Sequence, residues 1–215
     1  GEYSSLSVAN AFDFETGLTL VKIRAENMAK AGDTQEGAMA AIIGLEDKRV
    51  SELCSDYSGN GVVVAANYNS PGQVVISGSS KAVKSVMDSA KVSGARMTVQ
   101  LNVSGAFHSP LMAPAREALA EMLDSLEISN SLFPVFTNVD AKPVIQGNDI
   151  KDSLIRQLEN PVLWSKSISS MKESGIESFV EVGPEKVLQG LNKRIDRKML
   201  SQGVESLEQV KHFNV

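Results

Sequence analysis

Hydrophobic residues recur along this chain with two different periods, and the period predicts which segments are helices and which are strands. Between Asp13 and Lys30 the spacing is three or four residues, which places four apolar side chains on one helical face. They are Leu18, Val21, Ala25 and Met28. We expect this face to pack on a core, and we expect Gly32 to end the helix.

The segment from residue 38 to residue 103 alternates between short apolar runs and helical patterns. Strands are expected at 38–45, 62–66, 73–77 and 96–103, and helices at 50–57 and 81–90. The turn sequence Asn-Ser-Pro-Gly at 69–72 joins the second and third strands into an antiparallel hairpin. The order β-α-β-β-α-β is that of a ferredoxin-like unit. We therefore predict that residues 37–101 form a small subdomain inserted into a larger domain.

The flanks of this unit alternate differently. Helices are expected at 111–126, 150–158, 165–173 and 185–195, and strands at 133–139 and 177–182. Strands that alternate with helices are typical of a parallel α/β layer. We predict the α/β class, with residues 1–36 and 102–215 forming one large domain. The tail after Arg197 is polar, and its structure stays open.

Composition narrows the class of protein. Hydrophobic residues make up 42% and charged residues 22% of the 215 residues, as in ordinary globular domains. No apolar run approaches the ~20 residues of a membrane-spanning helix, so we predict no membrane span. The formal charge is −5, from 21 basic and 26 acidic residues, and no basic stripe is interleaved with aromatic residues. A nucleic-acid partner is therefore not expected.

Cysteine and histidine are scarce. The single cysteine, Cys54, cannot form an internal disulfide, and we interpret it as a small buried hydrophobe. Two histidines and one cysteine give no metal-ligand spacing, so no metal is expected. This usage points to a reducing cytoplasm. The chain starts at Gly1 without methionine or signal-peptide features, and we expect a further segment upstream.

Two residues are candidates for chemistry. His108 lies where a predicted strand stops and a helix begins, a place where α/β sheets build sites, so it is either a general base or an ordinary capping or packing histidine. Arg24 lies at the edge of the apolar face of the first helix. It is either paired with an acid such as Glu26, or reserved for a substrate carboxylate that it grips with two parallel hydrogen bonds. His212, in the polar tail, is expected to be solvated.

Other polar positions have a structural role as their first interpretation. The segment from Asn67 to Gln73 is first of all a turn, and binding is its secondary interpretation. Gln157 and Asn160 end a predicted helix just before Pro161, where such side chains satisfy free backbone groups.

Six short segments in this order resemble the malonyl-CoA:acyl carrier protein transacylases. They are Gly1-Glu2-Tyr3-Ser4, Arg24 with Met28, residues 67–73, Gly105-Ala106-Phe107-His108-Ser109, Gln157-Leu158 with Asn160-Pro161-Val162, and Glu181-Val182-Gly183-Pro184. The match runs through nearly the whole chain and includes the inserted ferredoxin-like unit. The resemblance implies that the large domain is of the α/β-hydrolase type and is incomplete in these residues.

The resemblance also implies roles for particular residues. Gly1 matches the last glycine of a Gly-x-Ser-x-Gly elbow, so the nucleophilic serine is expected two residues before it. His108 matches the catalytic base, and Gln157 matches the position whose backbone carbonyl orients the imidazole, with its side chain expected to be incidental. Arg24 matches the arginine that pairs with the malonyl carboxylate. Asn67 falls in a matching segment and is a candidate for substrate binding. Phe107 resembles the malonyl-selective version of its segment.

The implied reaction moves malonyl from coenzyme A to the phosphopantetheine thiol of acyl carrier protein, in fatty acid biosynthesis. No cofactor is implied, and the partners are malonyl-CoA, acyl carrier protein and the upstream segment of the same protein. The expected location is the cytoplasm, or an organelle with a bacterial-type pathway. Because the sheet would lack its central strand, we expect the 215 residues alone neither to turn over substrate nor to fold stably.

Three alternatives stay open at this point. The chain could be the acyltransferase domain of a polyketide or fatty acid synthase. It could be a non-catalytic scaffold, if no serine precedes Gly1. The ferredoxin-like unit could also be a regulatory small-molecule module.

Overall fold

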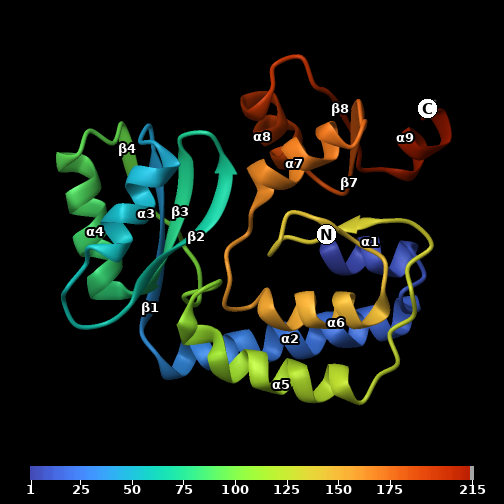
Figure 1. Ribbon diagram of the computed structural model, residues 1–215, viewed down its shortest axis with the longest axis horizontal. Coiled ribbons are helices and arrows are strands. Elements are labelled where there is room, and N and C mark those ends of the chain that lie inside the picture. Colours follow the sequence, from blue (N-terminus) through green and yellow to red (C-terminus); the bar gives the residue numbers. More distant parts are fainter. Residues whose placement is uncertain (214–215) are drawn as a thin grey trace.

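The computed structural model describes residues 1–213 (Figure 1). A four-stranded sheet with two helices forms one part, and a layer of longer helices forms another. A C-terminal group of short strands and helices lies above the helical layer in this view. This mixture of helices and sheets confirms the predicted α/β class.

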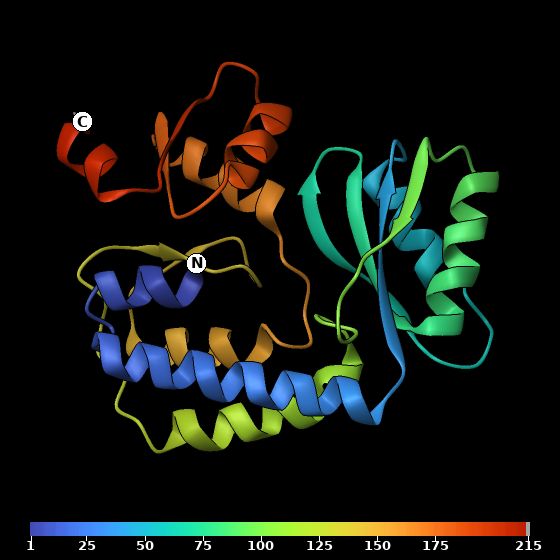
Figure 2. The same cartoon turned by 180° about the vertical axis from the view of Figure 1, so that it is seen from behind.

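Two helices open the chain, α1 (Glu2–Val8) and α2 (Phe14–Thr34). Asp13 caps α2, because its Oδ1 accepts a hydrogen bond from the backbone N–H of Thr16 at 2.7 Å. The predicted helix is confirmed, but it continues past Gly32, which does not end it. Figure 2 shows α2 as a long rod that runs from the N-terminal region toward the four-stranded sheet.

The buried face of α2 differs from the predicted one. Leu18 and Val21 are 59% and 42% exposed, and only Met28 of the predicted stripe is buried. The residues that face the core are Gly17, Leu20, Met28 and Ala31. This stripe keeps the helical period but passes through Arg24 and includes a glycine. An apolar pattern therefore selects the wrong face of this helix.

The four-stranded sheet has the order β2-β3-β1-β4, with every neighbouring pair antiparallel. The elements of this part are β1 (Gly37–Ile43), α3 (Asp47–Ser55), β2 (Val63–Ser70), β3 (Gln73–Ser79), α4 (Ser80–Val92) and β4 (Met97–Gln100). Their order along the chain confirms the predicted β-α-β-β-α-β sequence of elements. Its division from the rest of the chain at residues 37 and 101 stays a prediction. Figure 1 shows α3 and α4 together on one side of the sheet.

Both faces of the sheet are buried at its central strand β1. On β1, Ala40 and Ile42 belong to the apolar cluster beneath α3 and α4. The alternate residues Met39 and Ala41 belong to a second cluster, as the two-residue period of a strand requires. Phe107 packs against that second cluster, so the sheet contacts the loop that carries His108.

Strand β2 is longer than its sequence suggests. Residues 67–70 belong to the strand, and the turn itself consists of Pro71 and Gly72. The prediction of a turn from Asn67 onward is therefore wrong for its first half. Pairing of this segment with Val74 and Val75 of β3 overrides the local turn preference of asparagine, at the cost of an irregular register.

The helical layer contains α5 (Ala113–Asp124), introduced by the 3-10 turn η1 (Pro110–Met112), and α6 (Gly147–Arg156). These helices pack with α1 and α2 around one apolar core. The strand predicted at 133–139 shrinks to β5 (Val135–Phe136), which pairs antiparallel with β6 (Pro143–Val144). The expected parallel pairing is therefore wrong for this segment.

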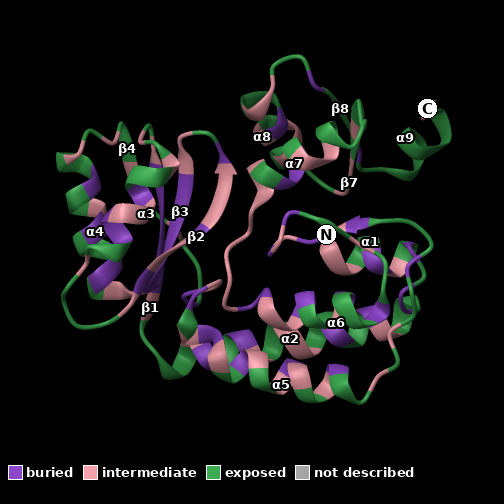
Figure 3. Cartoon of the chain, in the orientation of Figure 1, coloured by how far each residue is buried: buried purple, intermediate pink, exposed green. Residues whose placement is uncertain are grey.

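The remaining elements form the C-terminal group. They are α7 (Trp164–Glu173), β7 (Ser178–Val182), α8 (Val187–Ile195), β8 (Leu200–Val204) and α9 (Leu207–His212). Strands β7 and β8 are parallel, so the tail left open by the sequence supplies the partner of a predicted strand. Figure 3 shows this group as largely exposed. In the described part of the chain, no helix is both long and apolar enough to cross a membrane.

Candidate active site

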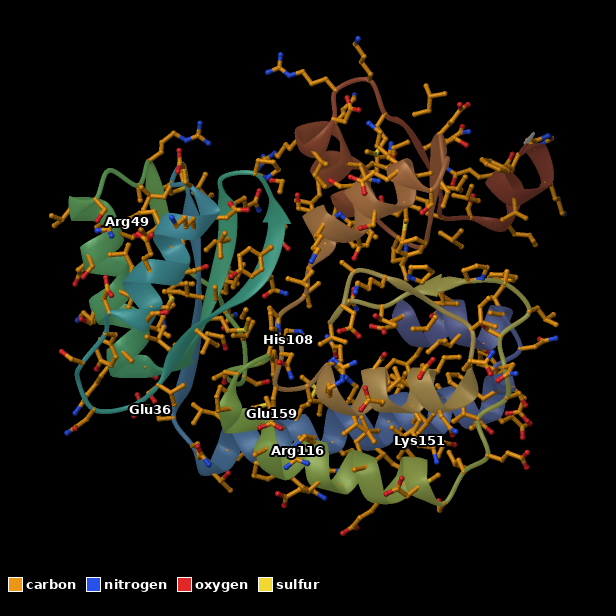
Figure 4. All side chains as sticks on the ribbon, in the orientation of Figure 1. Glu36, Arg49, His108, Arg116, Lys151 and Glu159 are labelled. Atoms are coloured by element: carbon orange, nitrogen blue, oxygen red, sulfur yellow. The ribbon has the colours of Figure 1, made fainter. Side chains whose placement is uncertain are left out.

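Three predicted site residues meet although they come from distant parts of the chain. Arg24 lies on α2, His108 lies in the loop before η1, and Gln157 is the C-terminal cap of α6. Figure 4 shows His108 between the four-stranded sheet and the helical layer. The site therefore lies where the two parts of the fold meet.

The backbone at His108 is unusual. Its φ of 58° lies in the left-handed region, which costs a residue with a side chain about 1 kcal/mol or more. The next residue, Ser109, is fully buried and holds the turn, since its Oγ donates to the carbonyl of Ala106 at 2.6 Å. The same Oγ accepts from the N–H of Leu111 at 3.3 Å, which starts η1. These two hydrogen bonds stabilise the backbone of the turn that carries His108.

The imidazole of His108 is oriented by backbone. Its Nδ1 lies 3.0 Å from the carbonyl oxygen of Gln157, one of the carbonyls left free at the end of α6. Burial lowers the pKa of His108 below 6.5, and the nearby charge of Arg24 lowers it further, whereas hydrogen bonds to the backbone of Gln157 and Asn160 oppose the shift. The ring is therefore neutral near pH 7.

The side chain of Gln157 is not incidental. It is 5% exposed, and its Oε1 accepts a hydrogen bond from Nη2 of Arg24 at 3.0 Å. Its Nε2 lies 3.2 Å from Nδ1 of His108. One buried amide therefore joins the arginine to the histidine.

Arg24 is a half-buried cation held mainly by neutral groups. Among residues 1–213, no ion pair joins it to Glu26, which is exposed. Its Nε is buried without a hydrogen-bond partner in the described chain. A guanidinium that keeps a free donor in a buried place is suited to an incoming carboxylate.

Two residues near Arg24 escaped the sequence analysis as site residues. Glu2 on α1 is half-buried, with its Oε1 inaccessible to solvent, and its Oε2 accepts a hydrogen bond from Nδ2 of Asn138 at 2.6 Å. Burial raises the pKa of Glu2 to about 7, although Asn138 and Arg24 act in the opposite direction. The hydroxyl of Tyr3 is also buried without a partner in the described chain, and burial raises its pKa. Only the Glu-Tyr pair after Gly1 hinted at these positions.

Of the two other predicted site residues, Phe107 directly precedes His108 and Asn67 lies on β2. Asn67 forms a parallel β-bridge with Val162. The backbone N–H of Tyr68 donates a hydrogen bond to the carbonyl of Val162, and the N–H of Val162 donates one to the carbonyl of Ala66, both at 2.8 Å. This bridge ties the segment after Gln157 to the edge strand β2. No hydrogen bond in the described chain joins the Asn67 side chain to Arg24 or His108. Asn160, for its part, caps the carbonyl of Arg156.

One cavity of the described chain lies apart from this site. A cavity of about 510 Å³ lies between α6 and the β5–β6 turn, but Arg156 and Asp140, paired across 2.7 Å, occupy its lining. It contains none of the predicted site residues. Within residues 1–213, no three histidine, cysteine, aspartate or glutamate side chains are placed to hold a metal ion.

Comparison with known proteins agrees with the residue-level resemblance. The model of the acyl transferase domain family matches residues 1–210. The malonyl CoA-acyl carrier protein transacylase of Bacillus subtilis is 41% identical over 211 residues, which are 98% of this chain and 67% of the relative. The enzyme of that name from Escherichia coli K12 is 44% identical over 195 residues, or 91% of this chain and 63% of the relative. The chain thus spans about two thirds of the length of these relatives.

Solved structures give the same result. The malonyl CoA-acyl carrier protein transacylase of Coxiella burnetii superposes with a TM-score of 0.94 at 39% identity, covering 99% of this chain and 67% of the other. An acyl carrier protein S-malonyltransferase from Vibrio cholerae superposes with a TM-score of 0.95 at 40% identity, covering 99% of this chain and 69% of the other. Family model, sequence and fold agree, and this chain belongs to the malonyl CoA-acyl carrier protein transacylases of the acyl transferase domain family.

Proposed function

We propose that this chain is the larger part of an enzyme that transfers malonyl from coenzyme A to the phosphopantetheine thiol of acyl carrier protein, in fatty acid biosynthesis. The observation that carries the proposal is the meeting of Arg24, Gln157 and His108 in one hydrogen-bonded group. It combines an acid-selecting cation with an oriented neutral base. Acyl transfer of a dicarboxylic thioester needs both.

The nucleophile in this proposal is a serine two residues before Gly1, as the resemblance implies. His108 takes the proton of the serine hydroxyl while the serine oxygen attacks the malonyl thioester carbonyl. The tetrahedral intermediate then expels coenzyme A thiolate, which receives the proton from the imidazolium. Arg24 holds the free carboxylate of the malonyl group and keeps the thioester in reach.

The second half-reaction reverses these steps with another thiol. The imidazole of His108 deprotonates the phosphopantetheine thiol, the thiolate attacks the malonyl ester, and the serine oxygen leaves with that proton. One base therefore serves both halves. The carrier thiol must be reduced for this step, which fits the cytoplasmic location expected from cysteine usage. A structure 38% identical to this chain shows a malonyl-transacylase in complex with an acyl-carrier protein, which supports a carrier protein as partner.

The test is the intact mass of the complete protein after brief incubation with malonyl-CoA. Wild type should gain one malonyl group, and the adduct should be discharged by phosphopantetheinylated acyl carrier protein. The His108→Asn variant should form the adduct far more slowly. A wild-type protein that forms no adduct would contradict the proposal and favour a non-catalytic scaffold.

A further inference from the structure

We propose that the Gln157 side chain couples the occupancy of Arg24 to the tautomer of His108, so that a substrate carboxylate on the arginine makes the histidine competent as a base. The inference rests on the proposed function, because it takes His108 as the base and Arg24 as the carboxylate-binding residue. It makes Gln157 a positioning residue that acts through the other two.

Arg24 dictates which way the amide of Gln157 faces. A guanidinium has only donors, so the atom 3.0 Å from its Nη2 must be the amide oxygen. The amide nitrogen is thereby directed to Nδ1 of His108, at 3.2 Å. If the amide were flipped, its N–H groups would face the N–H groups of the guanidinium, and no hydrogen bond could form. As long as Arg24 holds the oxygen, an N–H group stays against the histidine.

Two groups of Gln157 then compete for Nδ1. The backbone carbonyl at 3.0 Å accepts a hydrogen bond only if Nδ1 carries the proton. The side-chain N–H at 3.2 Å donates one only if Nδ1 carries the lone pair. A neutral imidazole has one N–H, so the two interactions exclude each other. The carbonyl favours a proton on Nδ1, and the amide favours a proton on Nε2.

Only one of these tautomers can act as the base. With the proton on Nδ1, Nε2 has the lone pair that accepts the serine proton. With the proton on Nε2, this nitrogen, which faces away from Gln157, has no free lone pair and cannot accept the serine proton. The Arg24–Gln157 hydrogen bond therefore stabilises the inactive tautomer in the absence of substrate.

A malonyl carboxylate removes this constraint. Its two oxygens accept parallel hydrogen bonds from the guanidinium, which is stronger pairing than one bond to a neutral amide. The Gln157 amide, released from Arg24, turns from Nδ1, and the backbone carbonyl binds the Nδ1–H group. In this change one proton leaves Nε2 to water and one reaches Nδ1 from water, so the charge of the ring is unchanged. A thioester without a carboxylate leaves the base in the wrong tautomer.

Two substitutions separate the parts of this argument. Gln157→Met keeps the length of the side chain and the backbone carbonyl but removes both amide contacts. It should raise the turnover of acetyl-CoA relative to malonyl-CoA about tenfold, because one hydrogen bond no longer stabilises the inactive tautomer and a tenfold change corresponds to the free energy of about one hydrogen bond. Gln157→Glu removes the donor toward His108 but strengthens the contact with Arg24. It should raise the KM for malonyl-CoA, because the introduced carboxylate occupies the guanidinium.

The direct test is nitrogen NMR of the complete protein labelled with ¹⁵N-histidine, at about pH 8, where a ring with a pKa below 6.5 is neutral. The His108 signal is assigned by its loss in His108→Asn. Added malonate should move wild type from the Nε2–H toward the Nδ1–H tautomer, whereas Gln157→Met should show Nδ1–H with and without malonate. If Gln157→Met does not fold, Gln157→Glu should show Nδ1–H without malonate.

Wild type with the same tautomer in both states would overturn the coupling, and so would a malonate response that persists in Gln157→Met. Either result, together with a normal malonyl adduct, would leave the proposed function standing. Failure of the proposed function is seen separately, as absence of the adduct in wild type.

Discussion

Arg24 and Gln157 lie 133 positions apart in the chain, and yet Nη2 of the arginine donates a hydrogen bond to Oε1 of the glutamine at 3.0 Å. The contact places a cation beside the group that orients His108. Under the proposed function, acyl selection and proton transfer are tasks of neighbouring side chains in one hydrogen-bonded group.

Arg24→Lys keeps the charge but loses the planar pair of donors. We expect kcat/KM for malonyl-CoA to fall about 100-fold, because two charge-assisted hydrogen bonds contribute roughly 3 kcal/mol. Turnover of acetyl-CoA should not fall, since acetyl has no carboxylate. The control is Arg49→Lys on α3, which Figure 4 shows far from His108. Equal loss with both thioesters would contradict the assigned role.

His108→Asn tests the base without confusing it with backbone strain. Asparagine tolerates the positive φ of 58° better than alanine does. Malonyl-adduct formation should slow about 10²- to 10⁴-fold, the usual contribution of a general base. His212→Asn, at the exposed end of α9, is the matched control and should react as wild type. Rapid quench-flow followed by intact-mass measurement gives the rate of adduct formation for both variants.

Phe107, directly before His108, packs against both the sheet cluster and the helical core. Phe107→Ser should open space next to the acyl group. The ratio of methylmalonyl-CoA to malonyl-CoA turnover should rise, while the protein loses on the order of 1–3 kcal/mol of stability from reduced packing. Both thioesters are measured on one enzyme preparation, so that the ratio does not depend on how much of the enzyme is folded. An unchanged ratio would remove Phe107 from the specificity residues.

Glu2 should make stability depend on pH. Its folded pKa of about 7 lies above the ordinary 4.5, so its stabilising contribution is complete below pH 4.5 and is lost as the pH rises through 7. Glu2→Gln stays neutral, and its stability relative to wild type should therefore grow between pH 5 and 8, by about 1–3 kcal/mol. Denaturant unfolding of the complete protein at several pH values measures it. Glu173→Gln, an exposed control, should stay within about 0.5 kcal/mol of wild type.

Gly32 should tolerate no side chain. A Cβ at this position would lie 2.2 Å from the backbone oxygen of Ser104, in the segment that leads to His108. Gly32→Ala should therefore destabilise by about 1–3 kcal/mol and slow adduct formation by displacing that segment. Gly190→Ala on α8, where a Cβ meets nothing within 4 Å, should be neutral or slightly stabilising. Equal effects of the two changes would argue against the close approach.

Much of the fold was predictable because its determinants are local. The period-2 runs and turn residues between 38 and 103 define the β-α-β-β-α-β order, and the helices at 13–30 and 165–173 follow from their spacing. Local signals did not predict the structure where pairing with another strand determines it. The segment after Asn67 became strand because β3 pairs with it, and the polar tail became strand β8 because β7 lies beside it.

For the site, the sequence by itself determined the residue types and the short motifs around Arg24, His108 and Gln157, and these were sufficient for the family. It did not determine which face of α2 is buried, because Arg24 lies in the stripe that packs and Leu18 lies outside it. Tertiary structure alone brought the end of α6 to His108, turned a capping glutamine into the link to Arg24, and buried Glu2 enough to raise its pKa. The physical reason is that hydrogen bonds and desolvation depend on distances between elements, which sequence spacing within one element does not encode.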